Sequence, residues 1–320
     1  MHPWHDILFR IATFERGIEV APWFKPMIPR EGREVVVLDV FDGPALRARA
    51  EHVPGLDKSL IGLIDDVDLV GSACEIAELA QARFGTDTSF GFVMSSHNLE
   101  HLPDPIRFLR GCESLLIPGG MIAMAVPDKR ACFDFFRAPS NTGEMLQAFH
   151  ERRERPTDAQ VFNYLSSLAY KPSPPAPDSS PSGDASPRYD GTWGIDDNPD
   201  QILPLGDLRQ AYDLWSRRHE THDTGYHDAH CWVFTPASLE LILTELILLG
   251  LLDLEIVLVS QTIGCEFFVH LRKRPRDAPP QTGLVERRQR LSKQLIEELA
   301  HVSHLGWERR AMPEKQAEAS

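Results

Sequence analysis

The chain has little cysteine, a shortage of positive charge and no apolar run long enough for a membrane-spanning helix. Its 320 residues include five cysteines, 33 Lys and Arg, and 47 Asp and Glu, which gives a formal net charge of −14. Because nucleic acid binding depends on neutralising phosphates, this balance predicts no nucleic acid partner. Acidic residues interrupt the apolar stretch 246–252 on both sides within the roughly 20 residues that a membrane helix needs. We therefore expect no membrane span.

The five cysteines are scattered and form no Cys-x-x-Cys pair, which is typical of reduced thiols. The first residues contain no long apolar core, so we expect no secretory signal and a cytoplasmic location. One local basic strip lies on a helix that we predict over residues 284–305, and a solvated helix face explains it better than a nucleic acid contact. This helix is also a candidate for contacts in a homodimer. The strip consists of Arg287, Arg288, Arg290 and Lys293.

Short apolar runs in the first half of the chain predict buried parallel strands. They lie at residues 18–20, 34–39, 67–70, 92–95 and 121–126. A short helix is expected over residues 76–84, and residues 131–170 also have a helical pattern. Thr235 and Pro236 predict the start of another helix that continues to Gly250, because threonine caps helices and proline suits the first turn. Two further strands, 254–260 and 266–273, would then close the sheet as a hairpin.

The most informative segment is the turn that follows the strand at 92–95. His97, Glu100 and His101 are spaced three and four residues apart, so one helical turn would place all three on the same face. Ligands of open parallel α/β sheets bind outside the carboxyl ends of the strands, which is where this turn is expected. Pro-Gly-Gly at 118–120 then predicts the end of a helix before the next strand.

Two motifs carry a family resemblance: SSHNLEHLPDP at residues 95–105 and LIPGGMIAMAVPD at residues 116–128. In this order and spacing they resemble class I, Rossmann-like S-adenosylmethionine-dependent methyltransferases, in the branch with EHxxDP, PGG and VPD patterns. The resemblance covers residues 15–135 and returns at 230–272. It implies an α/β three-layer sandwich with a seven-stranded, mostly parallel sheet and an antiparallel last hairpin. It also implies S-adenosyl-L-methionine as the cofactor.

The resemblance places the cofactor at four strand ends. In the first loop Ala21 stands where the family has glycine, although glycine allows a closer backbone approach. Asp39 is implied as the ligand of the ribose hydroxyls, with Asp42 as a nearby competitor. The cofactor residues that the resemblance implies are Glu19, Ala21, Pro22, Asp39, Ser72, Ala73, Cys74, Ser95 and Ser96.

The resemblance implies a catalytic set of His97, His101 and His230 near the reactive methyl group, since histidine removes protons near neutral pH. With Glu100, these histidines also offer the donor atoms of a divalent transition metal site, as in metal-assisted relatives. Glu-His recurs at this point in metal-free members, so the expectation is a site without metal. Asp228 could orient His230 two residues later.

The sequence predicts three parts. Residues 1–135 and 231–274 would form the cofactor-binding domain, residues 136–230 a helical and loop insertion over the acceptor, and residues 275–320 a C-terminal helix and tail. Within the insertion, the stretch 172–188 is rich in Pro, Ser, Asp and Gly, which predicts disorder.

The expected function is O-methylation of a small or medium acceptor such as a sugar, with a small molecule or glycan as the partner. One alternative is a catalytically degenerate methyltransferase fold that acts as a binding or scaffold subunit. Another is a redox enzyme that binds a different nucleotide. The lack of a Gly-x-Gly-x-x-Gly motif after the first strand weighs against the redox enzyme.

Overall fold

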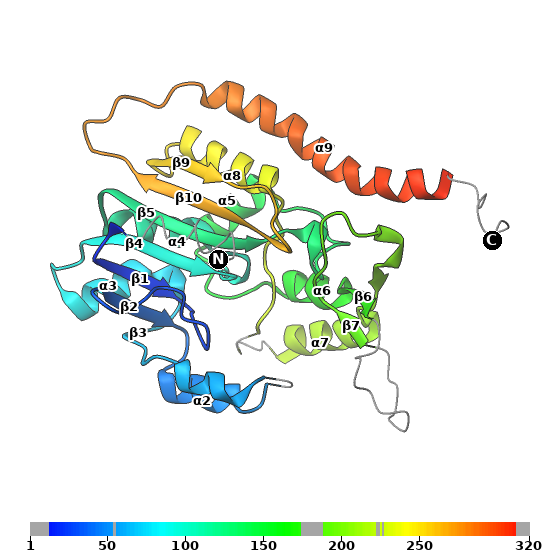
Figure 1. Cartoon of the computed structure of the whole chain (residues 1–320), viewed down its shortest axis with the longest axis horizontal. Coiled ribbons are helices and arrows are strands. Elements are labelled where there is room, and N and C mark those ends of the chain that lie inside the picture. Colours follow the sequence, from blue (N-terminus) through cyan, green and yellow to red (C-terminus); the bar gives the residue numbers. More distant parts are fainter. Residues whose placement is uncertain (1–12, 54–55, 174–187, 222–224, 226, 312–320) are drawn as a thin grey trace, which may run out of the picture.

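The computed structural model describes residues 13–53, 56–173, 188–221, 225 and 227–311. Its centre is a seven-stranded sheet with the order β3-β2-β1-β4-β5-β10-β9 (Figure 1). β1 to β5 run parallel, whereas β10 is antiparallel to both β5 and β9. The predicted sheet with a reversed last hairpin is thus confirmed. Its strands are β1 (Arg16–Val20), β2 (Glu34–Asp39), β3 (Leu69–Val70), β4 (Phe90–Ser96), β5 (Leu116–Pro127), β9 (Leu254–Val259) and β10 (Glu266–Lys273).

The helices begin where local capping chemistry predicts. Thr235 accepts a hydrogen bond from the Ser238 N–H at 3.2 Å and caps α8, which has Pro236 in its first turn. Asp104 caps α4 in the same way, by accepting from the Arg107 N–H at 3.0 Å. The helices are α2 (Gly43–Ala50), α3 (Ile76–Phe84), α4 (Pro105–Leu115), α5 (Thr142–Glu151), α6 (Asp158–Ser166), α7 (Leu208–Thr221), α8 (Pro236–Leu248) and α9 (Leu284–Ala311).

One prediction about the sheet needs correction. The helix α4 already ends at Leu115, and Pro118-Gly119-Gly120 lies inside β5, where the pairing with β4 shifts its register. Gly119 has a φ of 82°, which glycine adopts without the steric penalty of other residues. The Pro-Gly-Gly motif therefore shapes an irregular strand entry and does not itself end the helix.

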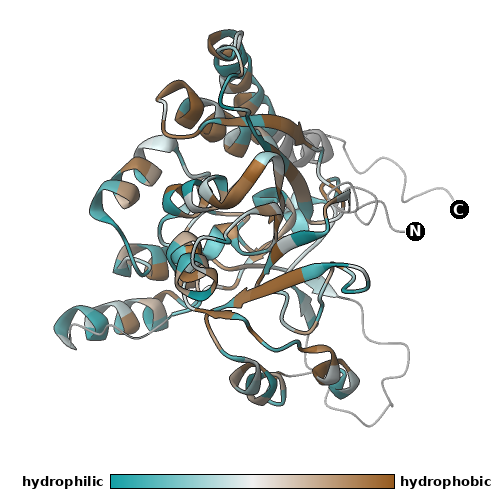
Figure 2. Cartoon of the chain, turned by 90° about the vertical axis from the view of Figure 1, so that its left-hand side faces the viewer, coloured by the Kyte–Doolittle hydropathy of each residue, from teal (hydrophilic) through white to brown (hydrophobic). Residues whose placement is uncertain are grey.

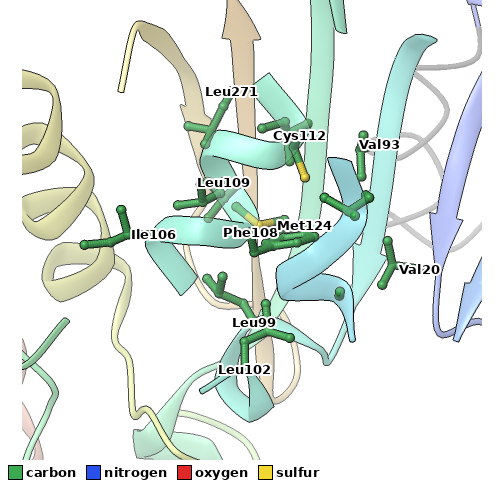
Figure 3. Packing of buried hydrophobic residues seen from close by; sticks show 14 of the residues in the cluster. Val20, Val93, Leu99, Leu102, Ile106, Phe108, Leu109, Cys112, Met124 and Leu271 are labelled. Atoms are coloured by element: carbon green, nitrogen blue, oxygen red, sulfur yellow. The ribbon is translucent and has the colours of Figure 1, made fainter. Parts of the chain in front are cut away.

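The main hydrophobic core lies on one face of the sheet, under α3, α4, α5 and α8. Figure 3 shows Phe108, Leu109 and Cys112 of α4 packed close to Val93 of β4 and Met124 of β5. In Figure 2 the sheet strands are largely hydrophobic, whereas polar residues gather on the outer turns of the helices. Each fully buried large apolar side chain contributes about 1.5–3 kcal/mol to stability. This core fixes α4 and the turn before it, which carries the histidines.

A smaller apolar cluster covers the opposite face of the sheet. It joins Phe92, Met94, Ala125 and Phe268 of the strands to Ile28 in the loop after β1. The loop is held there by Glu19, whose carboxylate accepts a hydrogen bond from the Met27 N–H at 2.6 Å.

The insertion contains a second, three-stranded sheet with the order β7-β6-β8, which corrects the expectation of helices and loops alone. Its strands are β6 (Ala169–Ser173), β7 (Arg188–Asp190) and β8 (Leu203–Pro204), and they are too short to leave a periodic pattern in the sequence. Of the stretch predicted to be disordered, residues 174–187 lie outside the described residues. The proposed domain boundaries stay a prediction.

The helix α9 lies beside α8 along the outside of the molecule (Figure 1). Two residues of its basic strip, Arg287 and Arg288, pair with Glu240 and Glu245 of α8 at 2.8 and 2.6 Å. The strip is therefore partly an interhelical contact and not only a solvated face. Among the described residues, no helix combines the length and hydropathy needed to cross a membrane.

The parallel register brings four strand ends to one edge of the sheet. Val20 pairs with Leu38 on one side and with Ser95 on the other, and Asp39 pairs with Val70. The segments that follow β1, β2, β3 and β4 therefore leave the sheet at the same edge, which is where parallel α/β folds bind ligands.

Candidate active site

A cavity of about 1000 Å³ opens at this edge of the sheet. One wall consists of strand-end residues from β1 and β2, together with the turns after β3 and β4. The opposite wall comes from the insertion, with residues 154–156 and 227–229. The cavity is at the upper end of the size range of small-molecule sites, about 300–1000 Å³. It is therefore large enough for a nucleoside-type cofactor and a second small molecule.

Backbone strain is concentrated around this cavity. Four described non-glycine residues have a positive φ, and three of them line the cavity: Ala21 (51°), Trp23 (44°) and His97 (48°). A left-handed conformation costs such residues roughly 1–2 kcal/mol each. Strain of this kind persists at ligand sites where the surrounding structure enforces it. Ala21 thus adopts the conformation that glycine would take, and its N–H donates to the Leu38 carbonyl at 2.8 Å.

The structure separates the two aspartates that follow β2. The side chain of Asp39 is 5% exposed, lines the cavity and accepts a hydrogen bond from the Phe41 N–H at 3.2 Å. Burial raises the pKa of this carboxyl, although backbone N–H groups and the charge of Arg49 act against the shift. Asp42 instead caps α2 by accepting from the Ala45 N–H at 2.9 Å. Of the two carboxylates, only that of Asp39 lines the cavity.

Four of the nine predicted cofactor residues line the cavity, and the other five do not. Glu19 is 1% exposed and engaged elsewhere, since it pairs with Arg30 at 2.6 Å and holds the loop after β1. The lining residues are Ala21, Asp39, Ser72 and Ala73, whereas Glu19, Pro22, Cys74, Ser95 and Ser96 lie outside the lining.

The turn after β3 shows why Ser72 lines the cavity and the nearby Cys74 does not. Ser72 caps a short 3₁₀ turn, Ala73–Glu75, by accepting from the Cys74 N–H at 3.3 Å. The thiol of Cys74 points the other way and donates to the Asp104 carbonyl at 3.4 Å. Burial raises the pKa of Cys74 to about 11, which makes this thiol a core group.

His97, Glu100 and His101 converge as predicted, but the local geometry is not that of an α-helix. His97 has left-handed backbone angles, and Leu99–His101 forms a 3₁₀ turn. One carboxylate oxygen of Glu100 lies 3.6 Å from Nδ1 of His97 and 3.8 Å from Nε2 of His101. The flanking Leu99 and Leu102 are buried in the main core and hold the turn in place (Figure 3).

The two histidines of this turn line the cavity, and both contact carboxylates. His97 Nε2 lies 2.6 Å from Glu266 of β10, and His101 Nδ1 lies 2.8 Å from Asp228 of the insertion. Burial lowers the pKa of each imidazole, but the hydrogen bond to its carboxylate and the nearby negative charges outweigh burial. The pKa of both His97 and His101 is therefore raised.

His230 occupies a different position from the one predicted. It is buried behind His101, with ring centroids 4.6 Å apart, and does not line the cavity. Its Nδ1 lies 2.5 Å from Asp134, so Asp134 orients His230. This corrects the expectation for Asp228, which pairs with His101 instead.

One comparison with known proteins found a family that part of the chain matches. Residues 27–124 match the model of a family described as a methyltransferase domain. The match covers the segment from the loop after β1 to β5, which contains Asp39, the turn after β3 and the histidine turn. Over these residues the chain is therefore similar to a methyltransferase domain. S-adenosylmethionine is the cofactor of such domains.

Solved structures resemble the chain only weakly. The methyltransferase CcbJ from Streptomyces caelestis has 14% identity and a TM-score of 0.38, and the alignment covers 84% of this chain and 94% of that one. A Galdieria sulphuraria protein described as a sarcosine dimethylglycine methyltransferase has 20% identity and a TM-score of 0.28. The chain spans 44% of the length of that protein, with 39% of its own residues.

A Rhodobacter sphaeroides protein described as a zinc-dependent alcohol dehydrogenase has 13% identity and a TM-score of 0.41, with 86% of this chain and 91% of that one covered. Because each of these TM-scores is below 0.5, the three structures contribute nothing to the functional argument. No curated protein matches the chain in sequence.

Sequence reasoning missed part of the cavity wall. Arg49 lies in α2 and His52 just after it, in the segment that continues from Asp39, and both line the cavity. They could have been expected there, because α2 follows a strand that ends at the ligand-binding edge of the sheet. Residues 154–156 of the insertion also line the cavity, and their sequence carries no such signal.

Proposed function

We propose that this methyltransferase domain transfers a methyl group from S-adenosylmethionine to a hydroxyl of a small or medium polyhydroxylated acceptor, such as a sugar. One observation carries the proposal: a single cavity joins the strand ends that hold cofactors in parallel α/β folds to the histidine turn and to the insertion. Cofactor and acceptor can therefore meet at His97.

The cofactor side of the cavity fits a nucleoside. Asp39 presents a buried carboxylate that can accept hydrogen bonds from ribose hydroxyls. Phe41, Leu46 and Val53 supply an apolar surface beside it, and Ser72 lies at the turn after β3. The strained backbone at Ala21 borders the same cavity on the side of β1. We assign these residues to the ribose, the adenine and the methionine end of the cofactor.

The acceptor side of the cavity is polar. Asn98, Glu154, Arg155, His227 and Asp228 line it, and they offer hydrogen-bond donors and acceptors of both charges. An acceptor with several hydroxyl groups can form hydrogen bonds with such a surface, whereas covering these polar groups with a purely apolar acceptor would cost free energy. This favours a sugar or another polyol.

His97 is the proposed base. Its side chain is 42% exposed and lines the cavity, and Glu266 holds Nε2 at 2.6 Å. This leaves Nδ1 as the ring nitrogen that can take the hydroxyl proton while the methyl group is transferred in line. The carboxylates of Glu266 and Glu100 would stabilise the imidazolium that results. His101 and His230 support this turn from the side of the insertion.

The experiment has two steps. Calorimetry should show binding of S-adenosylhomocysteine and no binding of NAD. The protein is then incubated with S-adenosylmethionine and a panel of monosaccharides, oligosaccharides, phenols and amines, and products are detected by mass spectrometry. Methylation of a sugar hydroxyl is the expected result. Methylation of amines alone would refute the O-methyl assignment, and cofactor binding without transfer to any acceptor would favour the scaffold alternative, which no observation in the structure supports.

A further inference from the structure

Glu100 is a buried carboxylate without a hydrogen bond. Its side chain is 0% exposed, and neither of its oxygens has a hydrogen-bond partner among the described residues. An ionised carboxylate in this position is costly unless positive charge compensates it. The side chain faces imidazole rings at 3.6 and 3.8 Å, so the structure concentrates nitrogen donors around the unpaired oxygens.

His101 and the buried His230 beside it are each contacted by a second carboxylate. Asp134 binds Nδ1 of His230 at 2.5 Å, and Asp228 lies 2.8 Å from Nδ1 of His101. Nδ1 of His230 is thus hydrogen-bonded and Nδ1 of His101 is in contact with a carboxylate, which leaves Nε2 of both rings as the donor atom. A carboxylate behind an imidazole is the usual arrangement in metal sites, where it fixes the tautomer and the orientation of the ligand.

The supporting carboxylate Asp134 is itself fixed. One of its carboxylate oxygens contacts Nδ1 of His230, and the other accepts a hydrogen bond from Arg137. Arg137 lies 2.6 Å from Asp134 in the interior. Both oxygens of Asp134 are therefore held by neighbours, which fixes the orientation of the His230 ring.

The backbone also brings the two segments together, although they are far apart in the sequence. The Trp232 N–H donates to the Glu100 carbonyl at 3.0 Å, and the Trp232 indole N–H donates to the Leu102 carbonyl at 2.5 Å. The Cys231 thiol donates to the His101 carbonyl at 3.3 Å. These bonds fix His230 beside the turn that carries Glu100.

We propose that Glu100, His101 and His230 bind one divalent transition metal ion, for which Zn²⁺ is the best fit. One donor atom from each residue lies within 4.8 Å of the other two. Ligand atoms at about 2.0–2.2 Å from zinc lie roughly 3.3 Å apart in a tetrahedron. The three side chains would therefore need to approach one another by at most about 1.5 Å.

Two histidine nitrogens and one carboxylate oxygen form a donor set that zinc accepts, and three protein ligands leave a fourth position open. Because His101 lines the cavity, this site borders the acceptor side. The metal would compensate the buried charge of Glu100 and tie the insertion to the end of the sheet. The proposal does not depend on the methyl acceptor, since metal binding is measured without turnover.

The test measures metal on the purified full chain. The protein is stripped with chelator and then titrated with Zn²⁺ by calorimetry and with Co²⁺ by visible absorption spectroscopy. We expect one equivalent of metal, and cobalt absorption bands typical of a tetrahedral site. Glu100→Gln keeps the size of the side chain but removes the anionic ligand, and it should weaken Zn²⁺ binding by more than about 100-fold. Asp134→Asn should weaken it by about 10- to 100-fold through loss of the supporting carboxylate.

His150→Ala serves as the matched control, because His150 is an exposed histidine of α5 that is not part of the site. It should bind Zn²⁺ as the unsubstituted protein does. Thermal unfolding gives an independent readout: Zn²⁺ should raise the Tm of the unsubstituted protein but not that of Glu100→Gln. The absence of stoichiometric binding, or equal binding by Glu100→Gln, would overturn the proposal. If Glu100→Gln does not fold, equal binding by Asp134→Asn would overturn it in the same way.

Discussion

Replacing Asp39 by alanine should weaken the binding of S-adenosylhomocysteine. The carboxylate is 5% exposed at the end of β2, where it faces the cavity and receives one hydrogen bond from the Phe41 N–H. A ligand ribose would add charge-assisted hydrogen bonds. The loss of such a bond costs about 1.5–3 kcal/mol, which corresponds to about a 10- to 150-fold higher Kd. Calorimetry with purified protein measures this change directly.

Asp42→Ala is the matched control for this experiment. Asp42 caps α2 through the Ala45 N–H, so its loss should cost about 0.5–2 kcal/mol of stability and leave the Kd nearly unchanged. An unchanged Kd in Asp39→Ala would remove Asp39 from the ribose role. An equal loss of affinity in both variants would show that the effect comes from the stability of this segment and not from a ribose contact.

Binding should also depend on pH through the same carboxyl. Burial raises the pKa of Asp39, while the Phe41 and Val40 N–H groups and the charge of Arg49 oppose the shift. Because the ionised form accepts hydrogen bonds from the ribose, affinity should be complete above the raised pKa and fall as the pH decreases through it. The loss should start at a higher pH than for an ordinary aspartate, whose pKa is about 3.9. Asp39→Asn should remove this dependence, and the same acid profile in that variant would refute the assignment.

Three further substitutions test other parts of the structure. Ala21→Gly should raise the free energy of unfolding by about 0.5–1 kcal/mol in denaturant titrations, because relief of the left-handed strain exceeds the entropic cost of glycine. A decrease would show that the methyl group of Ala21 makes a stabilising contact. His97→Gln should lower turnover by about 10²–10⁴-fold while S-adenosylhomocysteine still binds, with the exposed His150→Gln as the control; full turnover would exclude His97 as the base. Gly17→Ala would place a Cβ 2.3 Å from a phenylalanine ring of β4 and should cost about 1–3 kcal/mol or more of stability. At Gly62 a Cβ meets nothing within 4 Å, so equal destabilisation of Gly62→Ala would contradict this reasoning.

The sheet was predictable because its signals are local. The run Glu34–Asp39 is β-branched and apolar, and it forms β2 with the predicted bounds. Thr235 and Pro236 mark the start of α8, because capping is a property of neighbouring residues. The small sheet of the insertion was not predictable, because strands such as Leu203–Pro204 are too short to show alternation.

The candidate site was only partly predictable. The i, i+3, i+4 spacing of His97, Glu100 and His101 correctly indicated that the three side chains converge. Glu19 was expected at the cofactor, but its carboxylate holds the loop after β1. The position of an acidic residue in a strand can be predicted from the sequence. Its hydrogen-bond partner cannot, because that depends on how the following loop folds back against the strand.

The sequence by itself determined the parallel strands, their carboxyl ends and the histidine turn, because these follow from hydrophobic runs and spacings within a few residues. Tertiary structure decided which groups from distant parts of the chain join them. His230 reaches Glu100 from about 130 positions away through the backbone bonds of Cys231 and Trp232, and Asp134 takes the place that Asp228 was expected to fill. Such contacts leave no local pattern, since they arise only when packing of the core fixes separate segments against one another.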